Sequence, residues 1–377
     1  MKLSAMQIQA IVDATKTPTP EQVRVVEAPR RPLLVVAGAG SGKTETMSMR
    51  VLWLLANHPD LTPASILGLT FTRKAAGELG DRLRERIRLL SREMPQMRER
   101  LDEDPVALTY NSFAERIVSE HGMRIGIDPD FAMLSEAGAL DLMTQIVEAW
   151  PTDLDETLSP TGVVGKILHL AGEIGEHGYT VETAREALEE FGRELEQVGR
   201  GNDVARNVID ANHRRLAFLG PIEAYQQRKR DMGVLDFSDQ LVLATRIVRE
   251  APAVRAALRD EFRAVLLDEF QDTSVIQMEL LSTLFGDHAV TAVGDPNQAI
   301  YGWRGASASS LETFLERFQT GVAEEDQTLT LSTAWRNDVS ILDAANRVAA
   351  PLREVASYQQ GKDALKAQSP VLVPRPG

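Results

Sequence analysis

Short apolar runs, each followed by a polar or glycine-rich turn, recur along the chain. Four or five consecutive Val, Leu, Ile and Ala residues without alternation are typical of a strand buried on both faces, as in a parallel sheet. Helical periodicity follows two of these runs, over residues 44–55 and 74–90. This repeat of strand, turn and helix predicts an α/β fold with right-handed crossovers and ligands at the carboxyl ends of the strands. The predicted strands are Leu33–Ala37, Ile66–Thr70, Ala264–Leu267 and Ala289–Val293.

The stretch from 113 to 225 has another pattern. Its apolar residues recur at helical spacing, and no run comparable to the four strands occurs in it. We interpret it as an all-helical insertion between two halves of one sheet. The periodic segments are 140–150, 163–174, 181–191 and 204–219, and a further helix is predicted over 339–352.

Composition narrows the class of protein. With 377 residues, of which 43% are hydrophobic and 25% charged, the chain reads as a globular protein of two or three domains. It contains no cysteine, which excludes disulfides, thiolate nucleophiles and cysteine-ligated metal centres. No apolar run reaches the length of a membrane span, and the first residues lack the apolar core of a secretion signal. We therefore expect a cytoplasmic protein with no membrane partner.

The charge is acidic overall but uneven. Lys and Arg number 41 and Asp and Glu 55, a net charge of −14, which argues against a protein that coats nucleic acid nonspecifically. Basic residues nevertheless outnumber acidic ones, nine to five, between 70 and 100. This cluster is either part of a basic groove or a solvated helix face.

A phosphate-binding loop is predicted between the first strand and its helix. The sequence Ala37-Gly-Ala-Gly-Ser-Gly-Lys-Thr44 lets successive backbone N–H groups point at phosphate oxygens beside a helix N-terminus. Lys43 is placed to reach the β- and γ-phosphates, and the Thr44 hydroxyl to bind Mg²⁺. The general motif begins with glycine, whereas this loop begins with Ala37, a residue small enough for the turn.

Two acids follow the third predicted strand. Asp268 and Glu269 begin the segment Asp268-Glu-Phe-Gln-Asp272, so both emerge at the carboxyl end of a strand. An acid there can hold a magnesium ion while its neighbour activates water for attack on a γ-phosphate. Such a turn is also a common helix cap, but together with the upstream loop it predicts nucleotide hydrolysis.

Six further segments complete a series. They are Thr19–Gln22 (TPEQ), Thr70–Ala76 (TFTRKAA), Thr109–Phe113 (TYNSF), Leu235–Leu241 (LDFSDQL), Val293–Ala306 (VGDPNQAIYGWRGA) and Leu331–Asn337 (LSTAWRN). In content and order the eight segments resemble the motifs of superfamily one DNA helicases of the UvrD/Rep/PcrA group. The RecB-like and AdnB-like helicase–nuclease subunits are similar too. The resemblance covers nearly the whole chain, and in this family the phosphate loop itself reads AGAGSGKT.

The resemblance implies ATP and Mg²⁺ as cofactors. It assigns catalysis to Lys43, Asp268, Glu269, Gln298 and Arg336, and metal binding to Thr44 and Asp268. Arg336 corresponds to an arginine that neutralises the γ-phosphate in the transition state. Trp335 replaces the usual tyrosine that stacks on adenine, and Gln22 would read the adenine edge. The nucleotide-binding set is Gln22, Ala39, Gly40, Ser41, Gly42, Lys43, Thr44 and Trp335.

The resemblance also implies contacts with single-stranded DNA and with junctions of single- and double-stranded DNA. An aromatic ring stacks on any base, which suits a protein that moves along any sequence. Phe71 and Trp303 are the main candidates for stacking, and Arg73, where relatives carry asparagine, would add a phosphate contact. The full DNA-binding set is Phe71, Thr72, Arg73, Thr109, Asn111, Tyr301, Trp303 and Arg304.

The expected organisation follows the family. Residues 1–112 and 226–326 would form a first RecA-like ATPase domain around the insertion at 113–225, and 327–377 would begin a second RecA-like domain. The chain thus resembles the N-terminal portion of an ATP-dependent helicase with 3′ to 5′ polarity. Alone it would be weakly active or inactive, because motifs of the second domain are missing.

Three other readings differ in testable ways. A phosphate-loop GTPase or kinase is disfavoured, since no NKxD guanine motif occurs. An ATP-binding switch would use the nucleotide to control a partner-binding surface on the insertion, and DNA would not stimulate its turnover. The parent protein would alternatively be a helicase–nuclease, with a partner subunit that the sequence leaves unidentified.

Overall fold

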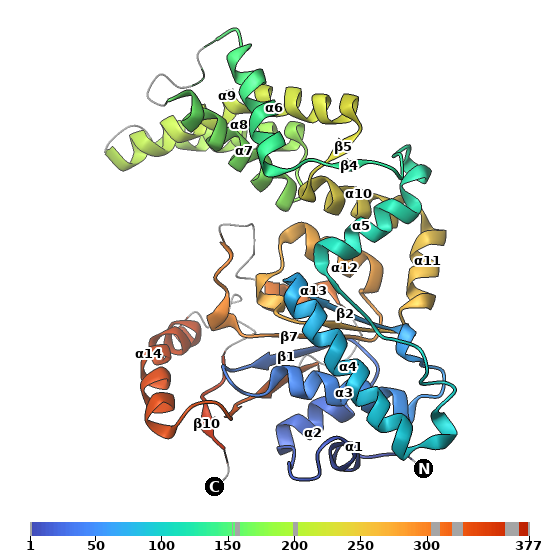
Figure 1. Cartoon of the computed structure of the whole chain (residues 1–377). Coiled ribbons are helices and arrows are strands. Elements are labelled where there is room, and N and C mark those ends of the chain that lie inside the picture. Colours follow the sequence, from blue (N-terminus) through green and yellow to red (C-terminus); the bar gives the residue numbers. More distant parts are fainter. Residues whose placement is uncertain are drawn as a thin grey trace. The chain divides into compact units, whose positions relative to one another are not determined.

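The computed structural model describes residues 2–152, 154, 159–198, 203–302, 310–318, 327–358 and 369–375. The chain divides into two compact units (Figure 1). The first unit comprises Met1–Phe113, Ala251–Thr273 and Met278–Gly377, and the second comprises Ala114–Glu250 with Ser274–Gln277.

A six-stranded parallel sheet forms the centre of the first unit, which confirms the predicted α/β class. The strand order is β3-β2-β6-β7-β1-β8, and every pairing is parallel. The strands are β1 (Leu33–Ala37), β2 (Ile66–Thr70), β3 (Val106–Thr109), β6 (Ala264–Leu267), β7 (Val290–Gly294) and β8 (Thr328–Leu331).

The four strands predicted from apolar runs are β1, β2, β6 and β7, and they are the four inner strands of this sheet. All residues of these four strands are buried, as expected for strands covered on both faces. The edge strands β3 and β8 were not predicted. Three of the four residues in each are only half-buried, so neither needs a long apolar run.

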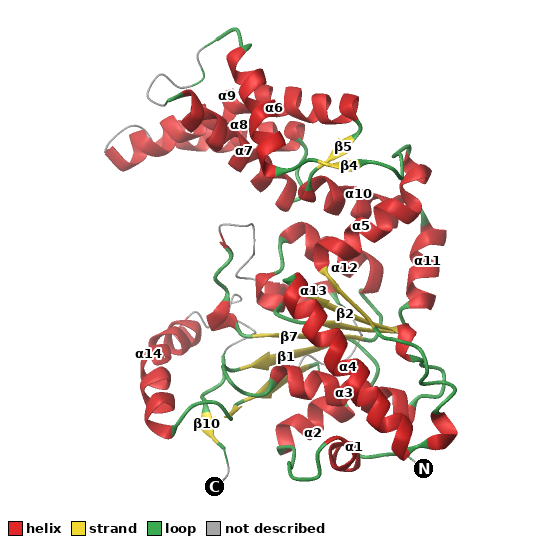
Figure 2. Cartoon of the chain, viewed as in Figure 1, coloured by secondary structure: helices red, strands yellow, loops and turns green. Residues whose placement is uncertain are grey.

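Helices cover the sheet on both faces (Figure 2). One face packs on α1 (Ala5–Val12), α2 (Pro20–Glu27), α3 (Lys43–Asn57) and α4 (Arg73–Glu93). Alternate residues of β1, Leu33 and Val35, point into this core, so Leu34 between them faces the other side. The remaining helices of this unit are α11 (Pro252–Glu261), α13 (Ser310–Arg317) and α14 (Val339–Tyr358), and α12 (Val275–Phe285) belongs to it from Met278 onward.

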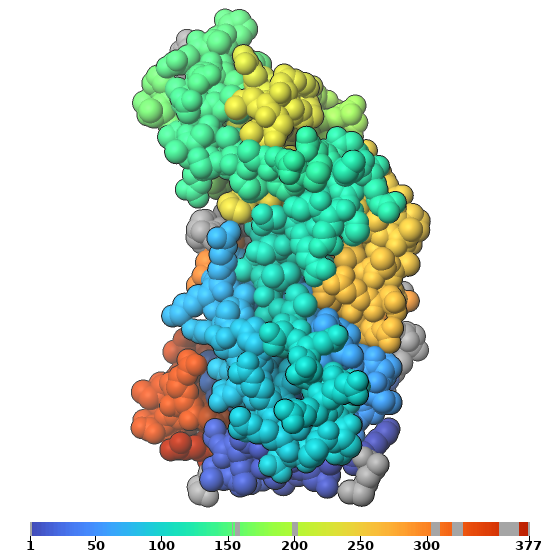
Figure 3. Space-filling model, turned by 45° about the vertical axis from the view of Figure 1, so that its right-hand side comes forward, coloured from blue at the N-terminus to red at the C-terminus, as the bar shows by residue number. Residues whose placement is uncertain are grey.

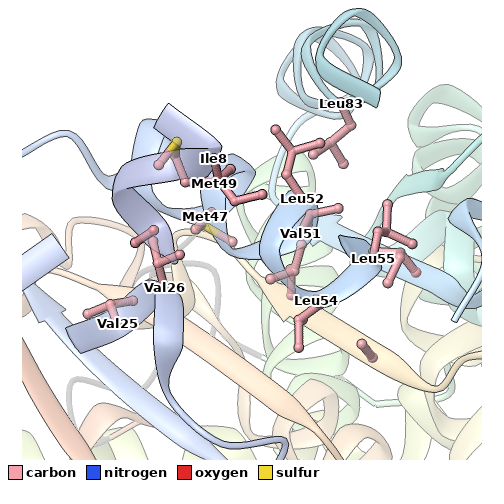
Figure 4. Packing of buried hydrophobic residues seen from close by; sticks show 14 of the residues in the cluster. Ile8, Val25, Val26, Met47, Met49, Val51, Leu52, Leu54, Leu55 and Leu83 are labelled. Carbon is pink, nitrogen blue, oxygen red and sulfur yellow. The ribbon is translucent and has the colours of Figure 1, made fainter. Parts of the chain in front are cut away.

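The packing of α3 explains why its helical periodicity was visible in the sequence. In Figure 4, Leu83 of α4 lies beside Leu52 of α3, and Met49 lies beside Ile8 of α1. The face of the first unit drawn in Figure 3 is formed largely by α4 and the segment that follows it. The predicted helices over 44–55 and 74–90 are confirmed as α3 and α4.

The second unit is helical, as predicted. The helices α6 (Glu136–Glu148), α7 (Pro160–Glu176), α8 (Val181–Val198) and α9 (Asp203–Met232) share an apolar core of their own, and α10 (Phe237–Glu250) completes the unit. The helix α5 (Tyr110–His121) leads into it, and a short parallel pair, β4 (Ala132–Met133) with β5 (Val234–Leu235), was not predicted. The expected boundary at 225 falls inside α9.

The segment expected to open a second domain at 327 begins differently. Its first strand, β8, pairs with β1 from Leu34 to Ala37 and so belongs to the first sheet. Backbone groups on that edge of β1 are thereby satisfied. The next strand, β9 (Thr333–Ala334), pairs with β10 (Val373–Pro374) outside this sheet. The domain boundary expected at 327 stays a prediction.

Candidate functional site

The carboxyl ends of the six parallel strands lie along one edge of the sheet, and each is followed by a predicted site segment. In strand order these segments begin after Thr109 of β3, Thr70 of β2, Leu267 of β6, Gly294 of β7, Ala37 of β1 and Leu331 of β8. The segments predicted to bind DNA follow β3, β2 and β7. Those predicted to bind nucleotide follow β6, β7, β1 and β8. The segment after β7 therefore belongs to both sets, and β6 lies between β7 and β2 in the sheet.

The loop after β1 has the backbone of a phosphate cradle. Gly40 and Gly42 have φ of 74° and 81°, a left-handed conformation that glycine adopts without strain. Gly42 is the N-cap residue of α3 and makes no side-chain cap, so the first N–H groups of this helix stay available to an anion. The Ser41 hydroxyl is buried and, within the described residues, has no hydrogen-bond partner. A buried donor of this kind suits a phosphate ligand.

Lys43 and Glu269 meet across the sheet. The Lys43 Nζ lies 3.3 Å from Glu269 Oε2 although the residues are far apart in sequence. Glu269 has a φ of 49° and is the single non-glycine residue with positive φ in the described part of the chain. Such a conformation costs on the order of 1 kcal/mol or more and is found most often at functional sites. The phosphate loop and the acids after β6 therefore converge on one place.

Asp268 is held from two sides. Its backbone N–H donates to the Leu69 carbonyl at 2.8 Å, and its own carbonyl accepts from the Tyr110 hydroxyl at 2.9 Å. Burial, and then the Glu269 charge, raise the pKa of Asp268 to about 6. Burial also raises the pKa of Tyr110 well above its ordinary value, so this residue stays a neutral donor. The role of Tyr110 was missed in the sequence because the TYNSF segment, to which it belongs, was predicted to contact DNA through Thr109 and Asn111.

The donor set fits a magnesium ion. Mg²⁺ takes oxygen ligands and usually holds one or two protein groups, with water and phosphate oxygens in the other positions. The Thr44 hydroxyl on the first turn of α3 and the Asp268 carboxylate after β6 are donors of this type. A low pH would weaken such binding, since the Asp268 pKa is about 6.

The predicted adenine contacts gather at Gly42. A Cβ atom on this glycine would lie 3.1 Å from Gln22 Nε2 and 3.8 Å from Trp335 Cδ1. Gln22 lies on α2, where its Oε1 accepts from the Thr19 N–H at 2.9 Å in a capping box. Trp335 is 38% exposed, and its backbone N–H donates to the Gly40 carbonyl at 2.9 Å. Both side chains thus border the phosphate loop from separate elements.

Arg336 and Gln298 also lie near the loop edge. A Cβ on Gly40 would be 3.1 Å from the Arg336 Cβ, which places the exposed arginine beside the phosphate cradle. Gln298 lies in the short helix Pro296–Gln298 after β7, and its Nε2 donates to Asp295 Oδ2 at 2.7 Å. Asp295 is buried and was not singled out in the sequence.

The residues predicted to bind DNA fall into two groups. Phe71 stacks on Tyr301 with ring centroids 4.6 Å apart, and Arg73 is exposed at the start of α4. Thr72 and Thr109, in contrast, use their side-chain oxygens to accept from backbone N–H groups of Ala75 and Ser112. Their helix-capping role was not anticipated.

Asn111 is half-buried near the start of α5. Trp303 and Arg304 lie outside the described residues. The structure therefore brings Phe71 and Tyr301 together but does not test the expected stacking of Trp303.

The sequence reasoning missed a buried arginine behind the site. Arg50 of α3 is 1% exposed and donates to four backbone carbonyls at the end of α2, from Val25 to Pro29, and to the Thr291 hydroxyl. Burial lowers its pKa to about 10, so it remains charged at neutral pH. The sequence signal that could have found this buried arginine is its place directly before the apolar run of α3.

Known proteins are similar in sequence to most of this chain. The model of the UvrD/REP helicase N-terminal domain matches residues 18–319. DNA helicase II of Escherichia coli (strain K12) is 30% identical over 327 residues, 86% of this chain and 39% of the relative. The ATP-dependent DNA helicases PcrA of Staphylococcus epidermidis and Leuconostoc citreum are each 28% identical, over 87% of this chain and 39% and 38% of their own lengths. The chain thus spans about two fifths of the length of these curated relatives.

Proposed function

The chain belongs to the family of UvrD/REP helicase N-terminal domains, and from that premise we propose that it is the ATP-binding portion of a DNA helicase. The protein would use ATP hydrolysis to move along single-stranded DNA, with 3′ to 5′ polarity. The observation that carries the proposal is the 3.3 Å approach of Lys43 to Glu269 beside the left-handed glycines of the phosphate loop.

Nucleotide binding would use the loop first. The amides between Gly40 and Thr44 and the positive end of α3 stabilise phosphate oxygens. A triphosphate would replace Glu269 as the partner of Lys43 and leave the carboxylate free to orient water. Gln22 and Trp335, which both border Gly42, would contact the base.

The hydrolysis roles follow from the residue types. Glu269 would accept a proton from the attacking water, while Asp268 and Thr44 would hold Mg²⁺. When bound, Mg²⁺ neutralises charge on the β- and γ-phosphate oxygens. Gln298 would sense the γ-phosphate and Arg336 would stabilise charge in the transition state. Movement on DNA would need a second lobe that closes on the nucleotide.

DNA binding would use the neighbouring segments after β2, β3 and β7. Phe71 and Tyr301 offer ring faces to bases of any sequence, and Arg73 offers a phosphate contact. Single-stranded DNA and its junctions with duplex would be the substrates. The overall charge of −14 makes such a local site more plausible than nonspecific coating.

Binding of a fluorescent ATP analogue with Mg²⁺ tests the proposal on this chain. Lys43→Ala should weaken binding by at least about tenfold, since it removes a charge-assisted phosphate contact. Lys16→Ala is the matched control, because Lys16 has a side chain 65% exposed and pairs only with nearby Asp13 among the described residues. Equal affinity of the two variants would refute the nucleotide site.

Hydrolysis measured with and without single-stranded DNA separates the motor from the switch reading. DNA should raise the rate of ATP hydrolysis by the chain. Turnover that is indifferent to DNA, with ATP binding intact, would favour a nucleotide-controlled interaction module.

A further inference from the structure

Gln271 connects two parts of the site that follow different strands. It lies in the short helix Phe270–Asp272 after β6 and is 3% exposed. Its Nε2 donates to Glu269 Oε2 at 2.9 Å and to Asp272 Oδ2 at 3.3 Å. Its Oε1 accepts from the Asp295 backbone N–H, after β7, at 3.1 Å. One side chain thus joins the carboxylate beside Lys43 to the loop that carries Gln298.

The neighbours of this amide determine its orientation. The Asp295 N–H is a donor and must face the amide oxygen, while the two carboxylates accept hydrogen bonds and must face the NH₂ group. A flipped amide would lose all three hydrogen bonds. Because the side chain is buried, water is not available to replace them, so the connection is specific.

The chain of hydrogen bonds continues through Asp295 to Gln298. Asp295 is 3% exposed, and its Oδ2 accepts from Gln298 Nε2 at 2.7 Å. Its Oδ1 accepts from the Asn297 N–H at 3.0 Å and from the Ser369 hydroxyl at 2.6 Å. The same loop leads on to Tyr301, which stacks on Phe71. A path of hydrogen bonds therefore runs from Lys43 to Gln298, and the backbone of the same loop continues it to the stacked rings that are predicted to bind DNA.

The Gln271 side chain packs against Gly294, where there is no Cβ atom. A Cβ on Gly294, the last residue of β7, would lie 2.8 Å from Gln271 Oε1 and 3.2 Å from its backbone nitrogen. Real Cβ atoms essentially never come within 3.0 Å of another atom, so Gln271 Oε1 and also Leu311 Cδ2, at 2.9 Å, would have to shift. Glycine at 294 is thus required for Gln271 to lie against the end of β7.

We infer that Gln271 is a positioning residue that couples the nucleotide to DNA. It links the position of Glu269, which changes partner when a triphosphate binds, to the loop from Asp295 to Tyr301. This inference rests on the proposed function, because it presumes that both ligands bind to this unit. Without the Gln271 amide, each ligand still binds alone, but neither affects the other.

Linkage between the two ligands tests the inference without requiring turnover. Affinity for a fluorescent oligothymidylate is measured with and without a non-hydrolysable ATP analogue and Mg²⁺. In the unaltered chain the analogue should change DNA affinity by about fivefold or more. In Gln271→Met, which removes all three hydrogen bonds, the change should shrink to less than about twofold. Affinity for each ligand alone should stay close to that of the unaltered chain.

Two further variants and a control keep the result interpretable. Gln271→Leu also lacks the donor toward Glu269 and the acceptor toward Asp295, and it decides the question if the Met variant does not fold. Gly294→Ala leaves Gln271 in the sequence but places a Cβ 2.8 Å from its Oε1 and 2.9 Å from Leu311 Cδ2, and it should also reduce linkage. Gln9→Met is the control, since Gln9 of α1 is also 3% exposed and, among the described residues, its Nε2 donates only to the carbonyl of Asp13, the C-cap of the same helix.

Three outcomes would overturn the inference. They are full linkage in the Gln271 variants, loss of nucleotide binding as complete as in Lys43→Ala, and equal loss of linkage in Gln9→Met. If the unaltered chain binds both ligands with no mutual effect, the inference fails and the nucleotide site stands. If it binds no nucleotide, the proposed function fails first.

Discussion

The ring of Phe71 lies 4.6 Å from the ring of Tyr301, with an angle of 23° between their planes. Phe71 follows β2 and Tyr301 follows β7, strands that are separated by β6 in the sheet. Both rings are half-buried, so each offers only part of its surface to a ligand. A stacked pair at this edge is a ready platform for a base, which would extend the stack.

Removal of either ring should weaken DNA binding. We expect Phe71→Ala and Tyr301→Ala to lower affinity for single-stranded DNA by about 1–3 kcal/mol each, because each removes a stacking surface. The measurement is fluorescence anisotropy of a labelled oligonucleotide. Phe191→Ala and Tyr179→Ala are matched controls, since these rings are 41% and 51% exposed in the second unit. Unchanged affinity in the first two variants would contradict a platform here.

Gly42→Ala should damage the nucleotide site with little effect on the rest of the fold. The left-handed backbone at this residue costs about 1 kcal/mol for alanine, and the new Cβ would lie 3.1 Å from Gln22 Nε2. Calorimetric titration with the Mg²⁺ salt of ATP should show weaker binding. Gly77→Ala on α4 is the control, since a Cβ there meets nothing within 4 Å. That variant should gain about 0.5–1 kcal/mol of stability from better helix propensity and bind ATP normally.

Arg50→Met should destabilise the first unit. The substitution leaves the carbonyls at the end of α2 and the Thr291 hydroxyl without their buried donor. We expect a loss of about 3–5 kcal/mol in the free energy of unfolding, measured by urea denaturation, and a smaller loss in Arg50→Lys. Arg88→Met, at an exposed position on α4, should change stability by no more than about 0.5 kcal/mol. Similar losses in both Met variants would argue against a special role for Arg50.

Asp268 should give the metal-free chain a characteristic pH dependence. Its pKa is about 6 in the folded chain, above the ordinary value of 3.8, so the folded state binds its proton more tightly than the unfolded state. The contribution of Asp268 to stability therefore falls as pH rises from about 4 to about 6 and is constant above that range. Asp268→Asn should become more stable than the unaltered chain through this interval, by about 3 kcal/mol at pH 7. Urea denaturation in EDTA at several pH values measures this difference, and a pH-independent difference would contradict the assignment.

The local part of the site was predictable because its signals are short in sequence. A phosphate loop needs a strand, a glycine turn and a helix in succession, and Leu33–Asn57 contain all three. The inner strands were predictable too, since burial on both faces demands unbroken apolar runs. Edge strands are only half-buried and need no such runs, which is why β3 and β8 were missed.

In the part of the chain that the structure describes, no helix is both long enough and apolar enough to cross a membrane.

The sequence alone determined the fold class, the phosphate loop, the acids after β6 and the family resemblance, because each depends on neighbours in the chain. Only the tertiary structure decided the strand order that brings Lys43 to Glu269, the stack of Phe71 on Tyr301, and the buried contacts of Arg50 and Gln271. Those contacts join residues from different strands and helices, and their geometry depends on how the sheet orders its strands, which no local pattern encodes.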